Sequence, residues 1–366
     1  MNLVFVCSSL NGGGAERVAV NLANSMVGLG HTVTIFLRKN LPDSYQLDSR
    51  VNKRISNFHS ISGQILSLKR LIDSEHKEVL VSFTDVPNII AFIALKVSKI
   101  KPVFIPTVHT NLRVRDERQT QGVRFKIIRY LHKHACHKSS YVVGVSEGGC
   151  QELVDYYKID KKKVVSILNP VIDNAALILS TKPYSARKKV KLVAAGRLTE
   201  AKNYFLMLDI IKKLNAEEYG RYCLDIYGEG ELASQLYEYA EALSIIDLIN
   251  FKGFETNLKD KLSNYDLFLF TSDWEGFGNV LVEALCAGLP VISTDCPSGP
   301  REILAGGKFG RLLPVGDVDA FCTAVKEEIR TPLKISNDDL VMHLNSFRGS
   351  VVAQKYIDLV KNAKRS

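Results

Sequence analysis

Short apolar runs alternate with amphipathic stretches along this chain, in two successive series. An apolar run followed by a stretch with helical spacing is typical of a βα unit, and repeated βα units form parallel sheets. The sequence therefore predicts two doubly wound α/β domains, whose ligands lie at the carboxyl ends of the strands. The first series predicts strands at 3–7, 33–37, 79–83, 103–108, 141–145 and 164–167. The second predicts strands at 191–195, 222–227, 248–251, 267–271 and 290–293.

A polar segment between the two series, 180–189, contains Pro183 and several basic residues. This composition is typical of an interdomain linker. We therefore place the first domain at 1–180 and the second at 190–340. Apolar residues of the tail recur at helical spacing, which predicts a final helix at about 347–364 that packs back on the first domain.

Length and composition restrict the class of protein. With 366 residues and 46% apolar side chains, the chain can form two cores. The longest apolar run, near 86–95, is far shorter than the about 20 residues that a membrane-spanning helix needs. The first strand follows Met1 without a basic segment, so we expect no signal peptide and a cytoplasmic location. Seven scattered cysteines without a C-x-x-C motif are expected to be reduced thiols.

The net charge of +9 is confined to the first half of the chain. Residues 1–183 hold 25 basic and 14 acidic residues, a balance of +11, and the remainder holds 23 and 25, a balance of −2. An excess of this kind indicates a partner with phosphate groups or an anionic surface. None of the usual DNA- or RNA-binding signatures occurs, so we expect no nucleic-acid partner.

The densest basic segment, 113–138, predicts an amphipathic helix because Val123, Ile127 and Leu131 recur at helical spacing among its cations. We expect it to face an anionic membrane surface or a charged acceptor; an ordinary surface helix is the alternative. Its histidines have no carboxylate cluster beside them, so we expect solvated or membrane-facing side chains at His132, His134 and His137 rather than a metal site. The residues assigned to this face are Arg113, Arg115, Arg124, Lys126, Arg129 and Lys133.

The segment 271–290 is the most informative motif. A strand is followed by a glycine-punctuated loop and a helix at about 279–287, with Asn279 as the expected N-cap. The first-turn N–H groups and the helix dipole favour an anion, and Gly276 and Gly278 let a phosphate approach the backbone. Glu283 lies on the same helix face as Asn279, where its carboxylate could bind ribose hydroxyls. The alternative is a capped helix whose carboxylates are merely solvated.

Glu275 and Glu283 stand eight residues apart within E-G-F-G-N-V-L-V-E-A, which is followed by G-L-P-V-I. This motif resembles family 4 glycosyltransferases. The resemblance extends to A-G-R-L-T-E-A-K-N at 195–203 and to G-G-G-A-E-R at 12–17. It implies the GT-B fold, in which two Rossmann-like α/β domains face each other across a cleft and the second holds most of the donor.

Residue roles follow from the same resemblance. Arg197 and Lys202 would bind the donor diphosphate, Glu275 would reach the sugar, and His109, directly after a strand, would contact the transferred sugar. We accordingly expect His109, Arg197, Lys202 and Glu275 to be catalytic. The donor-binding set comprises Gly13, Gly14, Arg197, Lys202, Gly228, Phe254, Gly276, Phe277, Gly278, Asn279, Val280 and Glu283.

The resemblance implies a retaining enzyme of capsule, O-antigen or N-glycan assembly. It would move a hexosyl or N-acetylhexosaminyl group from a nucleotide sugar, UDP-linked by our interpretation. From the +11 balance of the first half, which would receive the acceptor, we expect a polyprenyl-diphosphate-linked saccharide at the inner face of the membrane. We expect no metal and no cofactor. Asp317 and Asp319 precede a helical pattern and are interpreted as an N-cap and a first-turn acid rather than a metal-binding pair.

Other functions remain open at this point. A nucleotide-sugar epimerase or a phosphorylase could use a similar fold. A nicotinamide-dependent oxidoreductase is disfavoured because the first glycine loop is not G-x-G-x-x-G. No acidic residue ends the second strand, near Arg38, to bind the ribose of NAD, although this alone leaves NADP open. A non-catalytic sugar-binding subunit is disfavoured because the predicted catalytic side chains of the second domain are all present.

Overall fold

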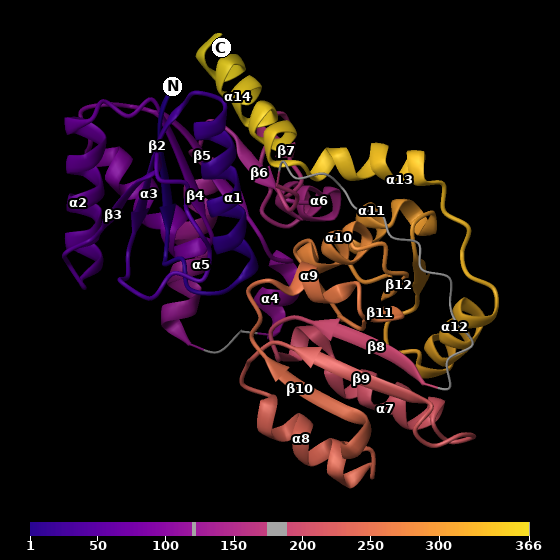
Figure 1. Ribbon diagram of the computed structural model, residues 1–366. Coiled ribbons are helices and arrows are strands. Elements are labelled where there is room, and N and C mark those ends of the chain that lie inside the picture. Colours follow the sequence, from indigo (N-terminus) through magenta and orange to yellow (C-terminus); the bar gives the residue numbers. More distant parts are fainter. Residues whose placement is uncertain (119–121, 174–188, 366) are drawn as a thin grey trace. The chain divides into compact units, whose positions relative to one another are not determined.

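The computed structural model describes residues 1–118, 122–173 and 189–365, and it divides into two compact units. The first unit combines Met1–Asn174 with Asn345–Ser366, and the second is Ala175–Leu344. Each unit is an α/β domain built on a parallel sheet, which confirms the predicted fold class (Figure 1). The predicted linker 180–189 lies, apart from its last residue, outside the described residues.

The first unit has a parallel sheet in the order β3-β2-β1-β4-β5-β6-β7. Its central strands β1, β4 and β5 are almost completely buried, as expected for a sheet with helices on both faces. The strands are β1 Asn2–Cys7, β2 Thr32–Leu37, β3 Asn52–Ile55, β4 Val79–Phe83, β5 Val103–Val108, β6 Val142–Gly144 and β7 Val164–Ser166. The helices are α1 Gly14–Gly28, α2 Ile61–Ser74, α3 Asp85–Val97, α4 Leu112–Arg118, α5 Val123–His137, α6 Glu147–Asp155 and α14 Gly349–Arg365.

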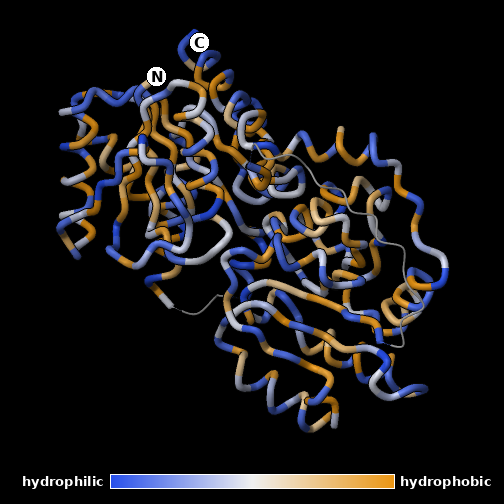
Figure 2. The backbone as a smooth tube through the Cα atoms, in the orientation of Figure 1, coloured by the Kyte–Doolittle hydropathy of each residue, from blue (hydrophilic) through white to orange (hydrophobic). Residues whose placement is uncertain are grey.

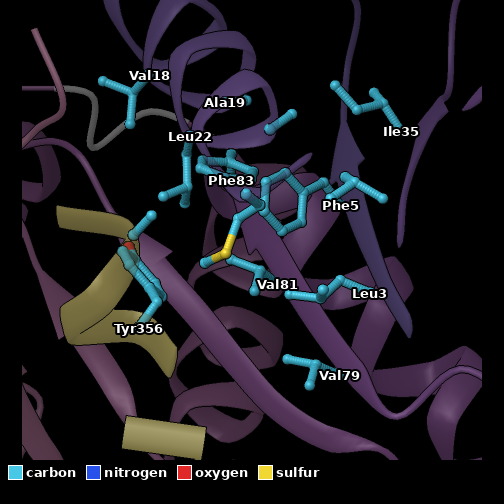
Figure 3. Packing of buried hydrophobic residues seen from close by; sticks show 14 of the residues in the cluster. Leu3, Phe5, Val18, Ala19, Leu22, Ile35, Val79, Val81, Phe83 and Tyr356 are labelled. Atoms are coloured by element: carbon cyan, nitrogen blue, oxygen red, sulfur yellow. The ribbon is translucent and has the colours of Figure 1, made fainter. Parts of the chain in front are cut away.

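The terminal helix α14 belongs to the first unit and packs beside α1 (Figure 1). Tyr356 of α14 joins the apolar cluster that also contains Leu22 of α1 (Figure 3). In the same cluster the rings of Phe5 and Phe83 meet edge to face with centroids 5.6 Å apart. The opposite face of the sheet is covered by apolar side chains of α2, α3 and α5.

The second unit has a parallel sheet in the order β10-β9-β8-β11-β12-β13. Figure 2 shows hydrophobic stretches along its central strands, while the connecting loops are mostly hydrophilic. The strands are β8 Val190–Ala195, β9 Tyr222–Tyr227, β10 Ile249–Gly253, β11 Leu267–Phe270, β12 Val291–Thr294 and β13 Arg311–Leu313. The helices are α7 Tyr204–Leu214, α8 Ala233–Ala242, α9 Leu258–Leu262, α10 Asn279–Cys286, α11 Pro300–Ile303, α12 Val318–Arg330 and α13 Asn337–Leu344.

Two edge strands, β3 and β13, were not predicted. The sequence of β3 is Asn-Lys-Arg-Ile, and β13 is only three residues long, so neither carries an apolar run. An edge strand has a single neighbour and needs little buried surface, so its pairing rather than its hydrophobicity defines it. All the strands that the sequence predicts are present, and their ends differ from the predicted bounds by at most two residues.

Asp317 is the N-cap of α12 and its carboxylate accepts a 2.8 Å hydrogen bond from the Ala320 amide, as predicted. Asp319 stands in the first turn, where a negative charge is favourable. Within the described residues no helix combines the length and the hydrophobicity needed to cross a bilayer.

Candidate active site

The loop after β11 and the first turn of α10 carry most of the predicted donor-binding residues. Gly278, with a φ of 100°, is the N-cap of α10, so the prediction that Asn279 caps this helix is wrong. Glycine adopts this left-handed backbone at little cost, and Asn279 is instead the first helical residue. The Phe277 ring is buried, so this residue could meet a ligand only through its backbone. The first turn of α10 remains a position where the dipole favours a phosphate.

Both glutamates of the predicted donor motif are shielded from solvent. Glu283 is 6% exposed, and the side chain of Glu275 is 12% exposed. Lys202 Nζ forms an ion pair with Oε1 of Glu275, and the Ser272 hydroxyl donates a 2.8 Å hydrogen bond to the same oxygen. The two carboxylates are therefore not solvated, as the alternative of an ordinary capped helix requires them to be.

The two predicted diphosphate-binding cations differ in their surroundings. Lys202 ends a short 3-10 turn before α7, and its Nζ lies 5.1 Å from the centroid of the Phe270 ring. Arg197 follows β8 and is exposed, and no carboxylate of the described residues forms an ion pair with it. Lys202 is thus fixed by Glu275, whereas the charge of Arg197 faces solvent and is available to an anionic ligand.

Glycine turns at the ends of β8 and β9 meet backbone to backbone. The Gly196 amide donates a 2.9 Å hydrogen bond to the Tyr227 carbonyl. A Cβ at Gly228 would lie 1.9 Å from the Gly196 carbonyl oxygen, so no larger residue fits there. Phe254, directly after β10, is 45% exposed. Predicted donor residues therefore gather at the carboxyl ends of neighbouring strands in this unit.

In the first unit, His109 directly follows β5 and its imidazole is half-buried against Phe83, with ring centroids 5.8 Å apart. Its Nε2 lies 2.7 Å from the hydroxyl oxygen of Thr107. Burial lowers the pKa of His109 to about 4. The imidazole is therefore neutral at physiological pH.

The glycine loop between β1 and α1 is held from one side by the segment after β2. The Gly12 amide donates a 2.9 Å hydrogen bond to the Ser44 hydroxyl, and the Tyr45 hydroxyl donates one of 3.1 Å to the Gly13 carbonyl. Gly13, with a φ of 83°, is the N-cap of α1, and Gly14 is its first residue. The loop thus occupies the carboxyl edge of the sheet, as His109 does at β5.

Arg115 was expected to face a membrane, and this prediction is wrong. The residue is 9% exposed, and its guanidinium is surrounded by Asp85, Asp116 and Tyr157. Two of its nitrogens donate hydrogen bonds of 2.9 and 2.7 Å to Oδ1 of Asp116, and a third forms an ion pair with Asp85. A buried charge requires this kind of pairing, and Arg115 consequently ties α3 to α4.

The prediction of a solvated or membrane-facing side chain at His132 is also wrong, because this histidine is completely buried under α3. The Asn88 side-chain amide lies 3.0 Å from Nε2 of His132, and Asp85 lies 3.4 Å from Nδ1. Burial lowers the pKa of His132. The helix face that packs on α3 includes this histidine, whereas His134 and His137 are half-buried.

The remaining predicted basic residues keep contact with solvent. Arg113, Arg124, Lys126 and Arg129 are exposed and Lys133 is half-buried. The sequence did not reveal that Arg129 approaches Asp116, with Nε 3.8 Å from Oδ2.

Three residues of the candidate site were not predicted: Thr107, Asn203 and Asp273. Asn203 and Asp273 stand inside the quoted motifs, but their 2.8 Å hydrogen bond joins segments distant in sequence, which no motif shows. Thr107 lies two residues before His109, and that spacing is the one local signal for their 2.7 Å contact. Across the described residues, no three side chains of His, Cys, Asp or Glu come together as a metal site would require.

Comparisons with known families match both units. The family described as "Glycosyltransferase Family 4" matches residues 12–174, and "Glycosyl transferases group 1" matches residues 180–339. An α-1,4-N-acetyl-D-galactosaminyltransferase of Campylobacter jejuni is 25% identical over 380 residues, covering all of both chains. An uncharacterized glycosyltransferase of Methanocaldococcus jannaschii is 30% identical over 194 residues, 51% of this chain. That match spans only 48% of the relative's length.

Solved structures agree at the level of the fold. The lipopolysaccharide outer core galactosyltransferase WaaB matches 99% of both chains with a TM-score of 0.73 and 18% identity. Anabaena HepE in complex with UDP and glucose matches 98% of both chains with a TM-score of 0.79 and 15% identity. Because the family 4 and group 1 matches cover the two units in turn and the fold agrees throughout, this chain belongs to the family 4 glycosyltransferases and has the GT-B fold.

Proposed function

We propose that this glycosyltransferase moves a hexosyl or N-acetylhexosaminyl group from a UDP-sugar to a saccharide linked to a polyprenyl diphosphate, with retention of configuration. The product would be an intermediate of a cell-surface glycan. The observation that carries the proposal is the Lys202–Glu275 ion pair at the carboxyl edge of the second unit's sheet. Exposed Arg197, directly after β8, supplies a second cation at the same edge.

The chemistry of this cluster suits a nucleoside diphosphate sugar. Two cations and the first turn of α10 can neutralise a diphosphate, and they stabilise it further as charge develops on the leaving group. Oε1 of Glu275 already accepts from Lys202 and Ser272, so Oε2 is the oxygen suited to accept from a sugar hydroxyl. Phe254 offers an exposed ring to a nucleobase. The HepE complex, which contains UDP, supports the choice of nucleotide.

Retention is supported by the names of the Campylobacter jejuni relatives, which specify α linkages. UDP-hexoses are α-linked, so an α-linked product keeps the configuration of the donor. We propose attack on the same face of an oxocarbenium-like centre, with the leaving diphosphate taking the acceptor proton. Arg197 and Lys202 hold that diphosphate, and His109 contacts the transferred sugar.

The acceptor assignment draws on relatives and on charge. Two Campylobacter jejuni relatives are named as transferases acting on undecaprenol-diphosphate-linked saccharides, and a Salmonella typhimurium relative as a lipopolysaccharide galactosyltransferase. The first half of the chain carries the +11 balance. Exposed Val123, Ile127 and Tyr130 share one face of α5, beside Arg124 and Lys126. We propose that this face binds the inner membrane surface peripherally.

One experiment tests the core of the proposal. Purified protein is screened against UDP-, GDP- and ADP-sugars by thermal unfolding, because a ligand that binds the folded state raises the apparent stability. The stabilising donor is then incubated with polyprenyl-diphosphate saccharides, with and without EDTA, and the product linkage is read by NMR. We expect an α-linked product, formed at the same rate with and without EDTA. Conversion of the donor without an acceptor would instead indicate an epimerase, and dependence on inorganic phosphate a phosphorylase.

A further inference from the structure

Asn203 joins two segments of the donor site that are distant in sequence. It ends the turn that carries Lys202 and is the N-cap of α7, with a left-handed backbone of φ 43° and ψ 55°. Its Oδ1 accepts a 3.2 Å hydrogen bond from the Leu206 amide, and its Nδ2 donates one of 2.8 Å to Oδ1 of Asp273. A backbone amide can only donate and a carboxylate can only accept, so these partners fix the orientation of the side chain.

Asp273 stands in the loop that carries Glu275, and further hydrogen bonds hold the same two segments together. The Asp273 amide donates a 2.9 Å hydrogen bond to the Ala201 carbonyl. The Thr271 hydroxyl lies 3.0 Å from the carbonyl oxygens of both Lys202 and Asn203. These contacts are made by the backbone or by Thr271. Asn203 and Asp273 supply a direct side-chain link beside the Lys202–Glu275 ion pair.

We propose that Asn203 is a positioning residue of the donor site. Through Asp273 it sets the loop of Glu275 against the turn of Lys202, so that the cation and the carboxylate meet the same donor molecule. This inference rests on the proposed function for its consequence, namely donor affinity. The link between the two loops is a property of the protein without ligand and can be measured separately.

The test uses reversal of the hydrogen bond. Asn203→Asp keeps an oxygen for the Leu206 amide but places a carboxylate against Asp273. Combining Asn203→Asp with Asp273→Asn exchanges donor and acceptor and restores the bond. Asn203→Gly keeps the left-handed backbone and removes the side chain, and glycine is itself a tolerated N-cap residue. Ser244→Gly, at another left-handed position with φ 56° in the same unit, is the matched control.

Trp274, the only tryptophan of the sequence, adjoins Asp273 and reports on the loop. In the ligand-free protein we expect Asn203→Asp and Asn203→Gly to increase acrylamide quenching of Trp274, and the reversed pair to restore it. With UDP and the donor sugar, we expect the two single variants to raise Kd and KM about tenfold while kcat falls less, and the reversed pair to return within about threefold of wild type.

Unchanged quenching and Kd in Asn203→Asp, or a reversed pair as impaired as the single variant, would overturn the inference. Equal loss in Ser244→Gly would show a general backbone effect and overturn it too. If wild-type protein ignores UDP while the quenching pattern holds, the proposed donor is wrong but the link between the loops stands.

Discussion

The hydroxyl of Thr107 determines which nitrogen of His109 carries the proton. Thr107 Oγ1 donates a 2.9 Å hydrogen bond to the Ser82 carbonyl, which can only accept. The same oxygen lies 2.7 Å from Nε2 of His109 and must therefore accept a hydrogen bond from it, which places the imidazole proton on Nε2. Nδ1 keeps its lone pair and can accept a hydrogen bond from a hydroxyl group.

In Thr107→Val the Nε2–H of His109 loses its acceptor. We therefore expect a mixture of the two imidazole tautomers and a kcat/KM that is lower by about tenfold. Thr107→Ser retains the acceptor and should keep both properties. Long-range ¹H–¹⁵N NMR of the imidazole measures the tautomer directly. A Thr107→Val protein that is still fully Nε2-protonated would contradict the assignment.

His109 also predicts a pH dependence of stability. Its pKa in the folded protein is about 4, below its ordinary value of 6.5, so the unfolded chain takes up this proton first as the pH falls. The contribution of neutral His109 to the free energy of unfolding is fully present above about pH 6.5. It is lost as the pH falls from about 6.5 to about 4. In urea unfolding, His109→Gln should flatten this part of the pH profile relative to wild type. A profile unchanged by the substitution would show that His109 is not the titrating group.

Arg197→Ala and Lys202→Ala should each lower turnover about a hundredfold, which corresponds to ~3 kcal/mol of lost transition-state stabilisation. The two should differ in stability. Arg197 is exposed, so its loss should leave the free energy of unfolding unchanged, whereas loss of Lys202 removes the ion-pair partner of Glu275. We expect a cost of about 1 kcal/mol for Lys202→Ala. Near-normal turnover in either variant would argue against a diphosphate role.

Glu275→Gln should separate diphosphate binding from sugar transfer. Lys202 now pairs with Glu275, and a neutral glutamine would leave its charge free for a diphosphate. We expect UDP to bind at least as tightly as in wild type, measured by calorimetry, while transfer falls about a hundredfold or more. Weaker UDP binding in Glu275→Gln would mean that the carboxylate organises Lys202 rather than competing for it.

Arg115→Met should destabilise the protein by about 3–5 kcal/mol, because Asp85 and Asp116 would be left without their common partner. Exposed Arg113 is the matched control, and Arg113→Met should change the free energy of unfolding by less than about 0.5 kcal/mol. Urea unfolding measures both. An equally small effect at Arg115 would mean that the buried ion pairs do not form in solution.

The face of α5 predicts a salt-sensitive attachment to anionic vesicles. Each basic residue near such a surface contributes about 1 kcal/mol, and the attraction weakens as salt screens it. Reversing Arg124 and Lys126 to Glu should abolish co-sedimentation and leave UDP affinity unchanged. Arg129 is left intact because its Nε lies 3.8 Å from Asp116.

Reversal of Lys161 and Lys162, exposed lysines elsewhere in the same unit, controls for net charge. We expect this control to bind vesicles as wild type does. Equal loss in the control would indicate attraction by the overall charge, and wild-type protein that ignores anionic vesicles would exclude the membrane site.

Features that depend only on neighbouring residues could be predicted from the amino-acid sequence. The strands Val79–Phe83 and Val103–Val108 have the predicted bounds because an apolar run between polar turns is a local signal. The glycine loops and the motif around Glu275 were equally visible, since backbone geometry and a helix start restrict residue types within a few positions.

The burial of polar groups together depends on tertiary packing, which local patterns do not show. Arg115 and His132 were predicted on a solvated face, yet both are buried. The packing of α5 on α3 encloses His132, and Asp85, Asp116 and Tyr157 enclose the Arg115 guanidinium. The contacts of Asn203 with Asp273 and of Lys202 with Glu275 join segments about seventy residues apart. Such pairs form only when the chain brings β8 beside β11, and no local pattern encodes that approach.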